Sequence, residues 1–186
     1  MQGEIHFESD PLVAPGTTCV VILPLQPCGS TRTTLLSPSD MEQAPDIRKP
    51  IQEEITILIV DDIKMNRLML NRRIKKGVAP NAAIMEAETG EAALKIVESG
   101  DQNFQVIVMD QYMESAGGAL LGTDAVIAMR RMGIKSMIIG CSGNDIDAAF
   151  REAGADLVWK KPMPPNADMI EQIRTGLGLH TCLYQS

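Results

Sequence analysis

The most informative stretch of this 186-residue sequence reads Ile55-Thr56-Ile57-Leu58-Ile59-Val60-Asp61-Asp62. Its first six residues are aliphatic apart from Thr56, and all but Leu58 are β-branched. An apolar run of this length predicts a strand that is buried on both faces, as in a parallel sheet with helices on both sides. The two aspartates then stand at the carboxyl end of that strand, where open parallel sheets bind their ligands.

The region 55–177 alternates between two hydrophobic patterns. Short apolar runs predict further strands at 82–87, 105–109, 136–141 and 156–160. Amphipathic segments predict helices at 64–76, 91–99, 123–132, 145–153 and 166–177. Thr89 and Gly100 frame the second helix as a capping residue and a stop. Strand–helix alternation with short connections predicts an α/β fold with a doubly wound, five-stranded parallel sheet.

The composition changes upstream of residue 55. Residues 28–54 are rich in Ser, Thr and Pro, which is typical of a linker because such a segment buries too little apolar area to offset its ordering entropy. We therefore predict a linker at 28–54, a folded domain at 55–180 and a short tail at 181–186. The chain has 17 Lys and Arg against 24 Asp and Glu, and residues 1–54 carry most of the resulting net charge of −7.

Charge and composition exclude several classes of protein. A net charge of −7 with 3% aromatic residues opposes nucleic-acid binding, which needs clustered basic side chains and aromatic platforms. The sequence has no signal-peptide pattern at its start and no apolar run of the ~18 residues that a membrane helix needs. None of the cysteines forms a Cys-x-x-Cys pair, which opposes a zinc site and fits a reducing compartment; they are Cys19, Cys28, Cys141 and Cys182. We expect a cytoplasmic segment without membrane contact.

Polar and charged side chains follow four of the predicted strands. Asp61 and Asp62 follow the first strand, and Asp110 follows the third. Three carboxylates so close together repel unless a cation joins them, and Mg²⁺ prefers a few carboxylates with a carbonyl and waters. Ser142 and Lys161, after the fourth and fifth strands, add a hydroxyl donor and a positive charge for phosphoryl oxygens. Singly, each residue is explained as a turn, a cap or a solvated charge; together they predict phosphoryl transfer to a carboxylate nucleophile.

Residues 55–177 resemble the receiver domain of two-component response regulators. The resemblance rests on an ordered series of motifs: Asp61-Asp62, Asn66-Arg67, Asp110 with Met113, Cys141-Ser142-Gly143, Ala153-Gly154-Ala155-Asp156 and Lys161-Pro162. It implies the flavodoxin-like receiver fold. It also implies a phosphorelay, in which a phosphoryl group passes from a phosphohistidine of a histidine kinase core to an aspartate and on to a histidine phosphotransfer protein.

The resemblance implies roles for individual residues. Asp110 would be phosphorylated, with Ser142 and Lys161 binding the phosphoryl group. Mg²⁺ would be held by four groups: the carboxylates of Asp61, Asp62 and Asp110 and the main-chain carbonyl of Tyr112. The bond from Lys161 to Pro162 is commonly cis in this family, a form that proline makes accessible.

Three residues near the phosphorylated position are predicted to modulate it: Tyr112, Met113 and Asn144. Tyr112 stands two residues after Asp110 and Asn144 two residues after Ser142, positions that flank the attacking water in the family. We expect the bulky Tyr112 side chain to shield the phosphoryl group and slow its hydrolysis.

Three features depart from the family pattern. The loop after Asp110 is longer than usual and carries Glu114 in place of a proline, which predicts altered Mg²⁺ geometry or partner choice. Val158 stands where the family often has a Tyr or Phe that reports phosphorylation, and Trp159 is predicted to face the opposite side of the sheet. The stretch 142–161 is short, which predicts a trimmed fourth helix.

A second resemblance lies upstream, in residues 3–26. They are similar to the end of a histidine-kinase ATP-binding domain, in which a Gly-Glu-Ile strand leads to a final strand ending in Leu-Pro-Leu. This similarity implies a kinase remnant at 1–27. It further implies that this chain is the carboxyl-terminal piece of a hybrid histidine kinase, and that any membrane attachment of that kinase lies outside this piece. Whether the chain is an enzyme is left open, because the catalytic core of such a kinase would precede Met1. The alternative is a strand-prone amino-terminal arm.

Other functions remain as alternatives. A receiver that docks a partner without accepting phosphate would keep the fold, although the complete set of site residues opposes it. An Asp-nucleophile phosphatase of the haloacid-dehalogenase type needs a second aspartate where Tyr112 stands. A dinucleotide-binding domain needs a glycine-rich turn after the first strand, where Asp61, Asp62 and Ile63 stand instead.

Overall fold

The computed structural model describes residues 4–8, 18–22, 49–143 and 147–179. The chain divides into two units, Met1–Ala44 and Pro45–Ser186. In the first unit, β1 (Glu4–Glu8) pairs antiparallel with β2 (Thr18–Ile22), with Glu4 opposite Ile22. Both strands fall within the stretch that resembles a kinase domain, whereas most of the predicted linker and the predicted tail lie outside the described residues.

The second unit contains a five-stranded parallel sheet with the strand order β4-β3-β5-β6-β7. Its strands are β3 (Thr56–Val60), β4 (Ala83–Ala87), β5 (Val106–Asp110), β6 (Met137–Ser142) and β7 (Leu157–Lys160). Neighbouring strands all pair in parallel. The predicted sheet is confirmed, and its flavodoxin-like strand order places β3 and β5 side by side at its centre.

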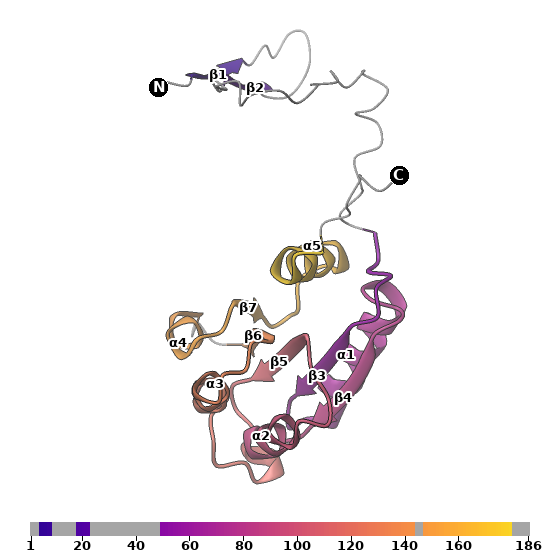
Figure 1. Cartoon of the computed structure of the whole chain (residues 1–186), viewed down its shortest axis with the longest axis vertical. Helices are drawn as coiled ribbons and strands as arrows, with labels where there is room; N and C mark the ends of the chain where they lie inside the picture. The colour runs from indigo at the N-terminus through magenta and orange to yellow at the C-terminus, as the bar shows by residue number, and fades with distance from the viewer. Residues whose placement is uncertain (1–3, 9–17, 23–48, 144–146, 180–186) are drawn as a thin grey trace, which may run out of the picture. The chain divides into compact units, whose positions relative to one another are not determined.

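Helices cover both faces of this sheet (Figure 1). They are α1 (Lys64–Gly77), α2 (Gly90–Ser99), α3 (Gly122–Arg131), α4 (Asp147–Ala153) and α5 (Asn166–Leu177). Helices α1 and α5 bury apolar side chains in a core on one face, and α2, α3 and α4 bury theirs in a second core on the other face. No helix in the ranges that the structure describes is long and apolar enough to cross a bilayer.

Side-chain alternation along each strand explains the sequence patterns. Ile57 and Ile59 point into the core beneath α1 and α5, whereas Leu58 and Val60 point into the core beneath α2, α3 and α4. A strand with helices on both sides therefore needs an unbroken apolar run. The same alternation along β7 places Trp159 in the core beneath α1 and α5 and Val158 against the core on the other face, as predicted.

The helix signals in the sequence are also confirmed. The Thr89 hydroxyl accepts a hydrogen bond from the Ala92 amide at 3.1 Å, which caps the amino end of α2. Gly100 ends α2 with a φ of +67°, a conformation that glycine adopts without strain. The described part of α4, Asp147–Ala153, has 7 residues. Residues 144–146, directly before it, lie outside the described residues, so the trimmed fourth helix stays a prediction.

The packed core begins at Ile51, inside the segment predicted to be a linker. The Ile51 side chain is fully buried in the core beneath α1 and α5, and its amide donates to the Val78 carbonyl at 2.7 Å. The Asn81 side chain donates to the Gln52 carbonyl at 2.8 Å. Composition averages over a whole segment, so one isoleucine near its end did not stand out from the surrounding polar residues.

Candidate phosphoacceptor site

The parallel strands bring the predicted site residues to one edge of the sheet. Asp110 and Ser142 are the last residues of β5 and β6. Asp61 directly follows β3, and Lys161 directly follows β7. Because all four strands run in the same direction, their carboxyl ends meet on this edge.

Lys161 joins the two buried carboxylates of the site. Its Nζ lies 2.8 Å from Asp110 Oδ1 and 2.9 Å from Asp61 Oδ2. Burial by itself lowers the pKa of Lys161, but its hydrogen bonds to Asp110 and Asp61 outweigh this, and the pKa is raised. Lys161 is therefore a fixed cation next to Asp110.

The carboxylate cluster holds more negative charge than Lys161 neutralises. One oxygen from each of Asp61, Asp62 and Asp110 lies within 4.8 Å of the others, with Asp61 and Asp110 buried and Asp62 half-buried. Burial raises the pKa of Asp110, the contacts with Lys161 oppose this, and the nearby charge of Asp61 adds to it. Clustered oxygen ligands with uncompensated charge fit a hard divalent cation such as Mg²⁺.

Asn66 holds Asp61 in its orientation. The Asn66 side-chain amide donates to both carboxylate oxygens of Asp61 at 3.1 Å, and the Ile63 amide donates to Asp61 Oδ1 at 2.9 Å. Asn66 lies in the first turn of α1, so the start of this helix positions a carboxylate at the end of the preceding strand.

Arg67 fixes the backbone beneath the cluster, a role that sequence reasoning missed. Its Nη1 donates to the carbonyls of Asp61 at 2.7 Å and Asp62 at 3.3 Å, although its side chain is only 5% exposed. Its Nε and Nη2 pair with Glu86 at 3.2 Å and Glu88 at 2.6 Å, on and just after β4. A signal was present in the sequence: Arg67 is three residues before Leu70 on the buried face of α1, where a charge needs partners.

The Ser142 side chain is buried at the end of β6. The main-chain carbonyl of Ser142 accepts a hydrogen bond from the Lys161 amide at 2.8 Å, so the two predicted phosphoryl-binding residues are joined through the backbone. Next to Ser142, burial raises the pKa of the Cys141 thiol to about 12, and its Sγ lies 3.3 Å from Met163 Sδ. Cys141 is therefore a neutral packing residue beside the site.

The connection after Lys161 is held in place by α1. The bond from Lys161 to Pro162 is cis, as the resemblance implied. Arg73 of α1 donates to Asn166 Oδ1 at 2.6 Å, to the Met163 carbonyl at 3.4 Å and to the Pro164 carbonyl. These contacts tie the segment that carries Lys161 to the helix that carries Asn66 and Arg67.

The predicted modulating residues differ in their surroundings. Met113 is buried in the core beneath α2 and α3, so it is a packing residue under the loop. Tyr112 is 46% exposed, so it lies at the surface, two residues after the predicted phosphoacceptor Asp110. Asn144 lies outside the described residues.

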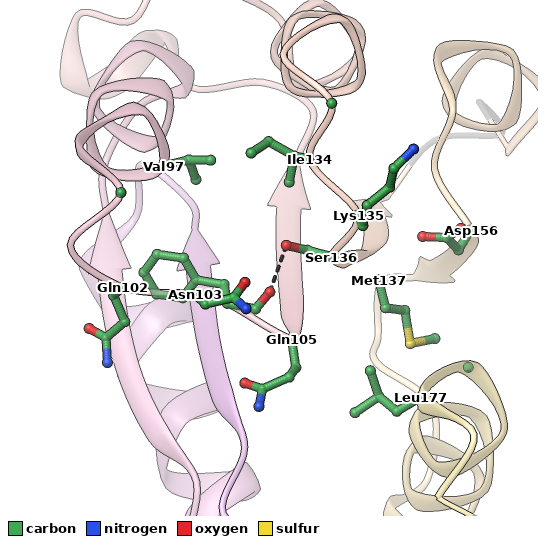
Figure 2. A pocket seen from close by; sticks show the side chains of 14 residues that line it. Val97, Gln102, Asn103, Gln105, Ile134, Lys135, Ser136, Met137, Asp156 and Leu177 are labelled. Carbon is green, nitrogen blue, oxygen red and sulfur yellow. Dashed lines mark hydrogen bonds between the residues drawn. The ribbon is translucent and has the colours of Figure 1, made fainter.

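A cavity of about 820 Å³ lies at the opposite edge of the sheet (Figure 2). Its lining comes from residues just before β5 and β6, including Gln105 and Ser136, and from the carboxyl ends of α2 and α5. Within this lining, the Ser136 hydroxyl donates a hydrogen bond to the Phe104 carbonyl at 2.6 Å, which joins the segments that precede β5 and β6. None of the predicted phosphoacceptor-site residues within the described ranges lines it. A smaller cavity of about 320 Å³ includes Lys161, between α1 and the segment after β7.

Comparison with known proteins agrees with this arrangement. The sequence model of the family described as "Response regulator receiver domain" matches residues 57–174. The two-component response regulator ORR42 of rice (Oryza sativa subsp. japonica) is 30% identical over 107 residues, which are 56% of this chain and 74% of that protein. The two-component response regulator ARR22 of Arabidopsis thaliana is 30% identical over 115 residues, which are 59% of this chain and 75% of that protein.

Solved receiver domains have the same fold. A receiver domain of Francisella response regulator 1452 superimposes with a TM-score of 0.57 at 20% identity, over 67% of this chain and 98% of that one. The receiver domain of the sensor histidine kinase PA1611 from Pseudomonas aeruginosa, solved with a magnesium ion coordinated in its active site cleft, gives a TM-score of 0.57 at 20% identity, over 68% of this chain and 99% of that one. With its sheet order, its strand-end carboxylates and the family match all in agreement, this chain belongs to the response regulator receiver domain family.

Proposed function

We propose that this chain is the phosphoryl-accepting module of a His-to-Asp phosphorelay. Asp110 takes a phosphoryl group from a phosphohistidine of a histidine kinase core and passes it to a histidine phosphotransfer protein. One observation carries this proposal: Lys161 Nζ lies within 2.9 Å of both Asp110 and Asp61, inside a cluster of three carboxylates. A nucleophilic carboxylate beside a fixed cation suits the transfer of a charged phosphoryl group.

The chain's own residues support the transfer step. An oxygen of Asp110 forms the new bond to phosphorus while the bond from phosphorus to the histidine nitrogen breaks, and the electron pair of that bond stays on the imidazole. The Lys161 ammonium, 2.8 Å from Asp110 Oδ1, pairs with the negative charge on the acyl phosphate, and the Ser142 hydroxyl donates to a phosphoryl oxygen. Mg²⁺ held by Asp61, Asp62, Asp110 and the Tyr112 carbonyl would neutralise charge on the phosphoryl oxygens.

Intact-mass measurement tests the acceptor. The protein is incubated with acetyl phosphate and Mg²⁺, and the expected result is the addition of one phosphoryl group. Asp110→Asn and chelation of Mg²⁺ should each abolish the adduct. Asp101→Asn, at an exposed aspartate away from the site, should leave it unchanged. Absence of any adduct on the parent protein with several donors and metals would favour a receiver that docks a partner without accepting phosphate.

The lifetime of the acyl phosphate is expected to depend on Tyr112. Its half-exposed ring follows the phosphorylated residue closely in sequence, and a large side chain there obstructs the approach of water. Tyr112→Asn should therefore shorten the half-life of the phosphorylated protein, followed by intact mass after removal of the donor. An unchanged half-life would reject the shielding role.

The wider context of the module is part of the proposal. The similarity of residues 3–26 to a kinase ATP-binding domain, together with the antiparallel pair β1 and β2, supports a hybrid histidine kinase. Its segments are a kinase remnant at 1–27, a linker that begins at residue 28 and ends before Ile51, the receiver domain up to residue 180 and a tail at 181–186. This module would then act in the cytoplasm. Sequencing the transcript upstream of Met1 tests this context: an open reading frame that encodes ATP-binding motifs supports it, and a stop codon directly upstream rejects it.

A further inference from the structure

The long loop between β5 and α3 has a defined path along α2 (Figure 1). It begins with a single 3₁₀ turn, Glu114–Ala116, and the Gly118 amide closes the turn by donating to the Met113 carbonyl at 3.1 Å. A Cβ atom at Gly118 would lie 2.9 Å from the Met113 carbonyl oxygen and 3.2 Å from the Thr89 side chain. The glycine therefore lets the loop approach the amino end of α2.

Glu91, in the first turn of α2, holds the end of this loop that leads into α3. Its Oε1 accepts hydrogen bonds from the amides of Ala119 at 2.8 Å and Leu120 at 2.9 Å. Hydrogen bonds from its own amide and from the amides of Ala119 and Leu120 hold the pKa of Glu91 below its usual value. Its Oε2 is shielded from solvent and has no hydrogen-bond partner among the described residues. One oxygen of this half-buried carboxylate therefore binds two successive amides of the loop.

The same loop contacts the carboxylate cluster at its other end. The Ser115 amide donates to Asp62 Oδ2 at 2.9 Å. Asp62 is the half-buried member of the cluster, and its main chain is already held by Arg67. The loop thus provides a hydrogen bond to the Asp62 side chain, and that contact depends on where the loop lies.

We propose that Glu91 is a positioning residue for the phosphoacceptor site: it fixes the loop 113–121, and the Ser115 amide of that loop orients the Asp62 carboxylate for a divalent cation. Partners of metal-ligating carboxylates set metal affinity because they fix the ligand's orientation before the ion arrives. Only the part of this proposal that concerns the divalent cation rests on the proposed function. The coupling of Glu91 to Asp62 through the loop stands on the contacts themselves.

Amide hydrogen exchange of the metal-free protein tests the coupling. Glu91→Ala should accelerate exchange at Ala119, Leu120 and Ser115, because the loop loses its anchor. Glu91→Gln keeps a neutral acceptor, so its effect should be smaller. Glu98→Ala, at an exposed glutamate of the same helix, is the matched control and should leave all three amides unchanged. Accelerated exchange at Ala119 and Leu120 with normal protection at Ser115 would overturn the proposal.

Mg²⁺ titration provides the second readout. The Kd of Glu91→Ala for Mg²⁺ should rise about threefold to tenfold, less than the roughly 10–100-fold typical when a direct partner of a metal ligand is removed. The Kd of Glu98→Ala should match that of the parent. An unchanged Kd in a variant with an unprotected Ser115 amide would reject the effect on Asp62. If the parent binds no Mg²⁺, the cation part of the proposed function fails, and exchange at Ser115 still decides whether Glu91 acts on Asp62.

Discussion

At the scale of single residues, Asp110, the proposed phosphoacceptor, carries a cost in stability. It is a buried carboxylate near two others, and burial raises its pKa above the ordinary 3.8. The folded protein therefore binds a proton at Asp110 more tightly than the unfolded chain does, and stability falls as the pH rises from 3.8 through the raised pKa. The surroundings of Asp110 thus favour neutralisation of its charge by a cation or by Lys161.

Asp110→Asn is consequently expected to stabilise the metal-free protein at neutral pH. Removing one of three clustered negative charges should add about 1 kcal/mol to the free energy of unfolding, on the order of 4 °C in Tm. Thermal unfolding in a chelator at a series of pH values measures this. The advantage should shrink as the pH falls below the raised pKa and be lost below 3.8, where the parent carboxyl is protonated in both states. A variant less stable than the parent at pH 7 would contradict the expectation.

Arg67 is expected to matter for both stability and metal binding. Arg67→Lys cannot reach two carbonyls and two glutamates at once, so the free energy of unfolding should fall by about 1–3 kcal/mol. Mg²⁺ binding should also weaken, because the backbone of Asp61 and Asp62 loses its support.

Arg130 offers the matched control for this prediction. It bridges the carbonyls of Gly154, Ile134 and Ser136 and the carboxylate of Asp156, away from the site. Arg130→Lys should lower stability without changing the Kd for Mg²⁺. Equal losses of Mg²⁺ affinity in the two variants would show that Arg67 acts only through overall stability.

At the scale of the elements, the packing of α4 on β6 depends on one small residue. A Cβ atom at Gly140 would lie 2.4 Å from the ring of Phe150, which is fully buried. This close approach lets the short helix α4 sit against the strand that carries Ser142.

Gly140→Ala should therefore destabilise the protein by about 1–3 kcal/mol, the usual range for overpacking a core. Gly143→Ala is the control, since a Cβ atom there meets no atom of the described residues within 4 Å. Urea unfolding of both variants measures the difference. A neutral effect of Gly140→Ala would mean that Phe150 moves aside without loss of packing.

At the scale of the whole molecule, the receiver unit should fold without the first unit, provided that Ile51 is kept. The fragment 45–186 contains the complete second unit and should match the full chain in the midpoint of its denaturant unfolding. The fragment 55–186 lacks Ile51 and should lose about 1–3 kcal/mol, the value of burying one isoleucine side chain less the entropy of ordering the segment. Equal stability of the two fragments would show that the segment before residue 55 contributes nothing to the core.

The local pattern of residues was sufficient to predict the strands, the helices and the edge that carries the site. An apolar run reflects a strand that is buried on both faces, and an amphipathic period reflects a helix that is buried on one face. Each pattern lies within a single element, so it can be read from the local sequence. For this reason α5, the caps of α2 and the strand-end positions of Asp61, Asp110, Ser142 and Lys161 agree with the sequence. The parallel sheet then brings these residues to a common edge by geometry alone.

Contacts between distant segments needed the tertiary structure. Lys161 and Asp61 are 100 residues apart in the chain, and the hydrogen bond that joins them exists only because β3 and β7 end on the same edge. Three further contacts also join segments that are far apart in the chain. They are the ion pair of Arg67 with Glu88, the packing of Ile51 in the core and the hydrogen bonds of Glu91 to the loop 113–121. Side-chain geometry, and the pKa values that follow from it, depend on neighbours in space, which a pattern along the chain does not specify.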